Sequence, residues 1–208
     1  MTGTKPPPSF LEDLASPRPD PGGGAAAAYV ALLALALSEK VARLELGRYQ
    51  PGDDRCAFWR EQWEALQRLQ ESFWRLCRDD VRAYQRLART SGRGVESEQR
   101  QAAILGAIDC PHEMMRSVHL VLQTTFAIGQ RCRKHLVGDV LVAVELLGAA
   151  LQGAYHIASA NLPLLKEVDK RQDLGAELDR NRDDGLNQLT NVREELTTRL
   201  TEAASKQV

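Results

Sequence analysis

Three consecutive glycines are the first feature of this sequence that could take part in ligand binding. Pro21 is followed by Gly22, Gly23 and Gly24, and an apolar run starts at Ala25. A glycine loop that opens into a helix leaves backbone N–H groups uncovered at the positive end of the helix dipole and lets a ligand approach the main chain. A flexible linker after a proline-rich segment has the same composition. The motif alone therefore leaves a ligand-binding loop and a linker as alternatives.

Asp80 occupies an apolar position in a long helical pattern. The other members of its stripe follow one another, with Asp80 among them, at steps of three or four residues: Trp59, Trp63, Leu66, Leu69, Phe73, Leu76, Tyr84 and Leu87. An ionised carboxylate on such a stripe is costly unless it is paired or lines a polar cavity. Asp80 is therefore either half of a structural salt bridge or a functional carboxylate.

Asp139 precedes a second strongly apolar segment, which runs from Val140 to Leu162. Its simplest role is that of an N-cap, which contributes about 1 kcal/mol to helix stability. Catalysis by the same carboxylate is the alternative.

Other kinds of site have little support in the sequence. His112 and His119 are seven residues apart, too distant to share a metal without a third ligand between them, so we expect no metal site. No Cys-x-x-Cys pair occurs, and we expect four reduced, mostly buried thiols: Cys56, Cys77, Cys110 and Cys132.

The composition excludes several classes of function. The chain has 208 residues, of which 43% are hydrophobic and 26% charged, as expected for one folded domain, 1–208. Its 27 basic and 28 acidic residues provide no global field for nucleic acid, so we expect no nucleic-acid partner. Residues 1–8 contain three consecutive prolines and resemble no targeting peptide. We expect them to be disordered and the protein to be cytoplasmic.

Helical periodicity and breakers predict an all-α bundle of six or seven helices, with long antiparallel helices and the glycine loop at the start of a buried one. Ser9 and Glu12 form a capping box for the first helix, and Pro111 either starts a helix or kinks a continuous one. An amphipathic helix in 170–208 covers the bundle. The expected helices span residues 10–15, 25–46, 55–90, 96–108, 111–131, 140–162 and 174–200.

Two of these helices are apolar on nearly every face. The first has an apolar run of about thirteen residues, from Ala25 to Leu37, which is too short for a membrane span. The second is interrupted by Glu145, Gln152 and His156. We therefore expect core helices, with no membrane partner. Part of their surface is expected to be buried against a second subunit, which predicts a homodimer.

Several motifs in register carry a resemblance to a known family. Phe10-Leu11-Glu12-Asp13-Leu14-Ala15-Ser16, Pro17, Pro19 and the glycine loop stand before an alanine-rich helix. Further matches are Val41-Ala42-x-Leu44-x-x-Gly47, Asp80-x-x-Ala83-Tyr84, Ala107-x-x-x-Pro111, Asp139 with Val142-Ala143, and Asn161-Leu162. Over residues 10–165 the chain resembles the formiminotetrahydrofolate cyclodeaminase and methenyltetrahydrofolate cyclohydrolase family.

The resemblance implies an all-helical homodimer that acts on the one-carbon unit of a tetrahydrofolate, with no other cofactor. Either a formimino group closes with loss of ammonia, or water opens a methenyl bridge to give 10-formyltetrahydrofolate. Asp80 and Asp139 would stabilise the positive charge of the reacting group and transfer protons. The glycine loop and Arg48 would bind the folate's glutamate tail, and Asn161 would contact the substrate.

The chain departs from the family pattern at several polar positions. Ala25 and Gly138 stand where the family has serine, and Ile157 stands where it has asparagine. Glu45 and Arg48 replace a threonine and a lysine. These replacements keep open an alternative function, in which the protein is a catalytically inactive member that acts through ligand binding or association.

Overall fold

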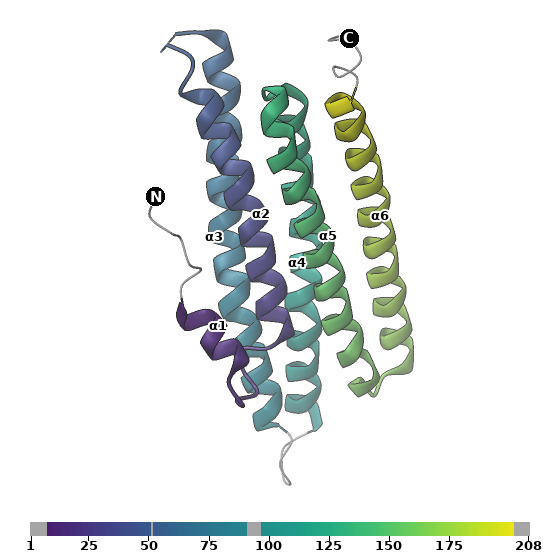
Figure 1. Cartoon of the computed structure of the whole chain (residues 1–208). Coiled ribbons are helices and arrows are strands. Elements are labelled where there is room, and N and C mark those ends of the chain that lie inside the picture. The colour runs from purple at the N-terminus through teal and green to yellow at the C-terminus, as the bar shows by residue number, and fades with distance from the viewer. Residues whose placement is uncertain (1–7, 51, 91–96, 202–208) are drawn as a thin grey trace.

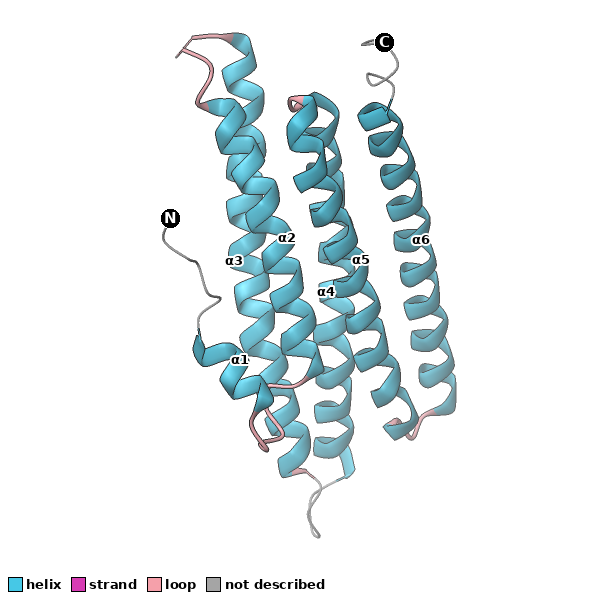
Figure 2. Cartoon of the chain, viewed as in Figure 1, coloured by secondary structure: helices cyan, strands magenta, loops and turns pink. Residues whose placement is uncertain are grey.

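The computed structural model describes residues 8–50, 52–90 and 97–201. These residues form six α-helices and no strand, which confirms the predicted all-α class (Figures 1 and 2). The helices are α1 (Pro8–Ala15), α2 (Gly23–Leu46), α3 (Asp54–Arg89), α4 (Ser97–Arg131), α5 (Val137–Asn161) and α6 (Val168–Thr201). Short 3-10 turns flank α5 at Lys134–Leu136 and Leu162–Leu164.

The five long helices lie side by side in an up-and-down bundle (Figure 1). Helix α2 packs against α3 and α5, α4 packs against the same two helices, and α6 covers α5 and α4. The short α1 lies outside α2 and α3, where Phe10 stacks on Tyr29 with ring centroids 4.3 Å apart. Because neighbouring helices run in opposite directions, the start of α2 lies beside the ends of α3 and α5.

The core is built mainly from the inward faces of α2, α4 and α5. Helix α2 supplies small residues such as Ala28 and Ala31, and these let α5 approach closely; a Cβ built on Gly153 would lie 3.1 Å from the Cβ of Ala27. The four cysteines are free, and all but Cys110 are buried, which confirms the predicted burial.

Two segments are long and apolar enough to cross a membrane when judged by length and composition alone, α2 and Lys134–Leu164. The sequence argument from a thirteen-residue run is therefore wrong for α2, because the complete helix has 24 residues. Both segments are packed in the bundle as core helices, which commonly pass the same test. The absence of a membrane partner stays a prediction.

Several predicted boundaries are corrected by the structure. Helix α1 begins at Pro8, so Ser9 lies within the helix rather than at its N-cap. Pro suits a first helical position, where its missing N–H would have no intrahelical partner. The other seven residues of the segment predicted to be disordered lie outside the described residues. Pro111 lies inside a single continuous α4, and α6 begins at Val168 rather than near residue 174.

Candidate active site

A cavity of about 300 Å³ lies at the end of the bundle where α2 begins. The antiparallel packing brings together the loop before α2, the last turns of α3 and the end of α5. Five of the seven predicted site residues line the cavity, namely Gly22, Gly23, Gly24, Asp80 and Asn161. The remaining lining residues are Pro19, Asp20, Val81, Ala83, Tyr84, Leu87, Ala107, Ile157 and Ala160.

The glycine loop forms the N-terminus of α2 and is not a linker. Gly22 is the N-cap, with an extended backbone and no side-chain cap, and Gly23 begins the helix. A Cβ on Gly24 would lie 2.1 Å from Oδ1 of Asp80, and one on Gly23 would lie 2.9 Å from Cδ1 of Ile157. Because α3 and α5 approach the start of α2 closely, a side chain at position 24 would displace the Asp80 carboxylate, and one at position 23 would push aside the end of Ile157.

Asp80 reaches the N-terminus of α2 from α3, where its carboxylate accepts a hydrogen bond from the backbone N–H of Ala25. Burial raises the pKa of Asp80 to about 6, and the Ala25 bond only partly opposes that rise. Among the described residues no lysine, arginine or histidine forms an ion pair with Asp80, which removes the salt-bridge alternative. A carboxyl group with this pKa exchanges its proton readily near neutral pH.

Asn161, the last residue of α5, lines one side of the cavity. Its Nδ2 donates to the carbonyl oxygens of Ala107 and Ile157, both at 3.1 Å. These two bonds use both amide hydrogens, so Oδ1 is the atom of this side chain that can accept from a ligand.

Sequence reasoning missed Asp20, the residue just before Pro21. Its Oδ2 accepts a hydrogen bond of 2.5 Å from Nε2 of Gln85 on α3, and it lines the cavity beside the glycines. The signal was present, because an acidic residue directly precedes the loop. What the sequence did not reveal is that α3 holds this residue against the cavity.

Asp139 and Arg48 do not line this cavity. Both lie near the opposite end of α2, about 35 Å away at 1.5 Å per residue over 24 residues. Asp139 accepts a hydrogen bond of 2.7 Å from Nζ of Lys40. Its predicted N-cap role is wrong, because the 3-10 turn before α5 lets the helix start earlier, with Leu136 as N-cap and Asp139 in the first turn.

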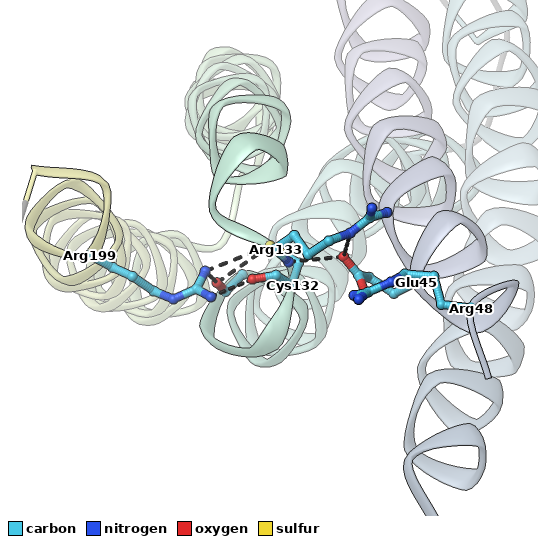
Figure 3. Close-up of polar contacts among 6 residues, drawn as sticks. Glu45, Arg48, Cys132, Arg133 and Arg199 are labelled. Carbon is cyan, nitrogen blue, oxygen red and sulfur yellow. Dashed lines mark hydrogen bonds and ion pairs between the residues drawn. The ribbon is translucent and has the colours of Figure 1, made fainter. Parts of the chain in front are cut away.

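The opposite end is an ionic network centred on Glu45, whose side chain is 1% exposed (Figure 3). Its Oε1 accepts from the backbone N and the Nε of Arg133, and its Oε2 accepts from Nη1 of Arg48, all at 2.9 Å. Burial by itself would raise the pKa of Glu45, but these hydrogen bonds lower it. Arg199 on α6 donates to the carbonyls of Gly129 and Cys132 (Figure 3). This network fastens the ends of α2, α4 and α6 together.

The comparisons with known proteins agree with the predicted resemblance. The family model for formiminotransferase-cyclodeaminase matches residues 8–180. A crystal structure of formiminotetrahydrofolate cyclodeaminase from Thermotoga maritima has the same fold, with a TM-score of 0.80, 20% sequence identity, and coverage of 94% of this chain and 95% of that chain. A search among curated proteins found no match. Because the family model covers most of its length, the chain belongs to the formiminotransferase-cyclodeaminase family.

Proposed function

We propose that this protein is an enzyme that acts on the one-carbon unit of a tetrahydrofolate in the cavity below the glycine loop. The reaction is hydrolysis of methenyltetrahydrofolate to 10-formyltetrahydrofolate, or closure of formiminotetrahydrofolate with loss of ammonia. The observation that carries the proposal is Asp80, a carboxylate in a cavity that pairs with no cation of the described chain and has its pKa raised to about 6. The family membership supports the substrate class.

Asp80 has the properties that either reaction needs. In hydrolysis, water adds to the bridging carbon and loses a proton to give a hydroxyl group. As the bond from that carbon to N5 breaks, N5 takes up a proton and the hydroxyl loses its own, which leaves the formyl group on N10 and releases one proton overall. In closure, N10 attacks the carbon of the protonated formimino group and loses its proton, and the nitrogen that departs as ammonia gains one. With a pKa near 6, Asp80 is mostly ionised at pH 7 and can accept the first proton and donate the second.

The same carboxylate stabilises the charge that the reaction carries. Both routes pass through a tetrahedral carbon beside a cationic, amidine-like centre, and an ionised Asp80 lies where few waters would screen the attraction. The N–H of Ala25 fixes its orientation, and Oδ1 of Asn161 is placed to accept from a ring N–H. Val81, Leu87 and Ile157 provide apolar walls for a planar ring.

A homodimer is part of this proposal. The two most apolar helices keep large side chains exposed at Leu33 and Leu44 on α2 and at Val142 on α5. Burying them against a second copy removes apolar surface from water. Sedimentation velocity at micromolar concentration is expected to give a dimer, and a compact monomer would contradict this part of the proposal.

The test is the absorbance decay of methenyltetrahydrofolate with purified protein, measured against buffer alone. We expect catalysed decay, or consumption of formiminotetrahydrofolate in a parallel assay. Asp79→Asn is the matched control for Asp80→Asn. It removes the neighbouring carboxylate, which pairs with Arg82 at 3.1 Å. A decay rate equal to that of buffer, with the formimino compound also unused, would favour the alternative of an inactive, ligand-binding member that Ala25 and Ile157 motivate.

A further inference from the structure

Asp20 gives the cavity a second carboxylate, for which the proposed reaction has no assigned role. Asp20 lies in the loop that leads to α2, and its hydrogen bond with Gln85 ties that loop to α3. The bond occupies Oδ2, so Oδ1 is the atom of Asp20 that is left to meet a ligand. Both residues are half-buried at the cavity, and the carboxylate of Asp80 lies against Gly24.

The charged side chains that line the cavity are all acidic. Its lining within the described residues contains two carboxylates and no lysine, arginine or histidine. Arg18, two residues before Asp20 in the sequence, is paired with Asp13 at 2.5 Å. Carboxylates withdrawn from water without a counter-charge are costly, and a positively charged ligand removes that cost.

The polar atoms of the side chains are arranged for a planar donor. The two carboxylates are acceptors, and so is Oδ1 of Asn161, because the Nδ2 of that amide is already bonded. Tyr84, which also lines the cavity, carries a hydroxyl group that can accept as well as donate. The remaining walls are largely apolar or small, including Ala83, Leu87 and Ile157. An amidinium group attached to a flat apolar body matches such a cavity, because its N–H donors and its charge both favour carboxylates.

We propose that Asp20 is a specificity-determining residue that, together with Asp80, makes this cavity select the cationic amidinium form of a one-carbon unit over the neutral formyl form. For folates the inference rests on the proposed function. In hydrolysis the substrate carries the charge and the formyl product does not. A cavity that selects the cation therefore binds substrate and releases product.

A probe that needs no folate tests the selectivity. Benzamidinium and its neutral isostere benzamide are titrated against the full chain by ligand-observed NMR at pH 7.5. We expect benzamidinium to bind at least about tenfold more tightly, as one charge-assisted contact allows. Asp20→Asn should weaken benzamidinium binding about three- to tenfold and leave benzamide unchanged. Asp20→Glu should keep most of the affinity.

Asp79→Asn is the control for long-range charge, because Asp79 is next to Asp80 in sequence but does not line the cavity. It should leave both affinities unchanged. Equal binding of the two probes, no binding of either probe, or an Asp20→Asn variant that behaves as the parent would each overturn the inference.

A second experiment, steady-state kinetics with methenyltetrahydrofolate, separates this inference from the proposed function. In Asp20→Asn the KM for methenyltetrahydrofolate should rise about three- to tenfold with kcat nearly unchanged, since Asp20 binds charge and moves no proton. Inhibition by 10-formyltetrahydrofolate should stay the same. If no folate is converted but benzamidinium selectivity depends on Asp20, the proposed function fails and the cation selectivity stands.

Discussion

A carboxylate that is largely removed from water lies at each end of α2, and the surroundings shift the pKa values of these two groups in opposite directions. Glu45 receives three hydrogen bonds, two from guanidinium groups and one from a backbone N–H, and its pKa is lowered. Asp80 receives one bond from the N–H of Ala25 and pairs with no cation in the part of the chain that the structure describes, and its pKa is raised. A satisfied buried charge fastens helices together, whereas an unsatisfied one remains available for a ligand or a proton.

Two predicted site residues lie at the paired end of α2, away from the cavity. Arg48 and Asp139 belong to the paired end, where Glu45 and Lys40 already neutralise them. Asp80 lies at the other end, where it faces the cavity and forms no ion pair with any described residue. Burial and pairing together, rather than residue type, separate a carboxylate that is open to a ligand from one that is held in an ion-pair network.

The largest expected effect is on turnover. Asp80→Asn keeps an acceptor for the N–H of Ala25 but removes the acid–base group, so we expect the rate of methenyltetrahydrofolate decay to fall by about 10²–10⁴-fold. Asp139→Asn should change the rate less than about twofold, because an exposed ion pair with Lys40 contributes little. Loss of turnover in the Asp139 variant would instead mean that this residue reaches a cavity from a second subunit.

Glu45→Gln should destabilise the fold by about 2–4 kcal/mol at pH 7, because it leaves Arg48 and Arg133 without their shared anion. The folded-state pKa of Glu45 is below its ordinary value of 4.5, so this stabilisation is complete above that value and is lost as the pH falls through the folded pKa. Urea unfolding at pH 7 and pH 4 measures the difference. A variant equally destabilised at both values would assign the loss to packing.

Asp80→Asn should change stability in the opposite direction, by about 1–3 kcal/mol of stabilisation at pH 8. The folded-state pKa of about 6 exceeds the ordinary 3.8, so the folded state binds more protons between these values and the ionised carboxylate costs most above pH 6. The gain should therefore be smaller at pH 5, as measured by urea unfolding. Destabilisation at pH 8 would show that Asp80 has a stabilising partner.

Gly24→Ala should have the smallest of these effects, destabilising the fold by about 1–2 kcal/mol because the new methyl group would displace the Asp80 carboxylate. The matched control is Gly106→Ala in α4, where a Cβ meets nothing within 4 Å. That change should stabilise the helix by about 0.5–1 kcal/mol. Thermal unfolding of both variants makes the comparison. Equal shifts would remove the steric reason for Gly24.

Much of the fold was predictable because helix periodicity and breakers are local. The stripe containing Trp59 and Phe73 predicted α3 as one helix, and the glycine loop marked the start of α2. The boundaries of the helices were harder to predict. Helix α5 starts at Val137 because a 3-10 turn precedes it, and α4 passes through Pro111. Both outcomes depend on packing against neighbouring helices rather than on local preference.

For the site, the sequence by itself determined which residues have unusual chemistry for their surroundings: three glycines before a helix and an aspartate on an apolar stripe. Only the tertiary structure decided which of them meet. Antiparallel packing brings Asp80 and Asn161 to the glycines, adds Asp20 through Gln85, and leaves Asp139 and Arg48 at the far end of α2. Residues 80 and 24 are far apart in sequence, so their contact is set by long-range packing, which no local pattern encodes.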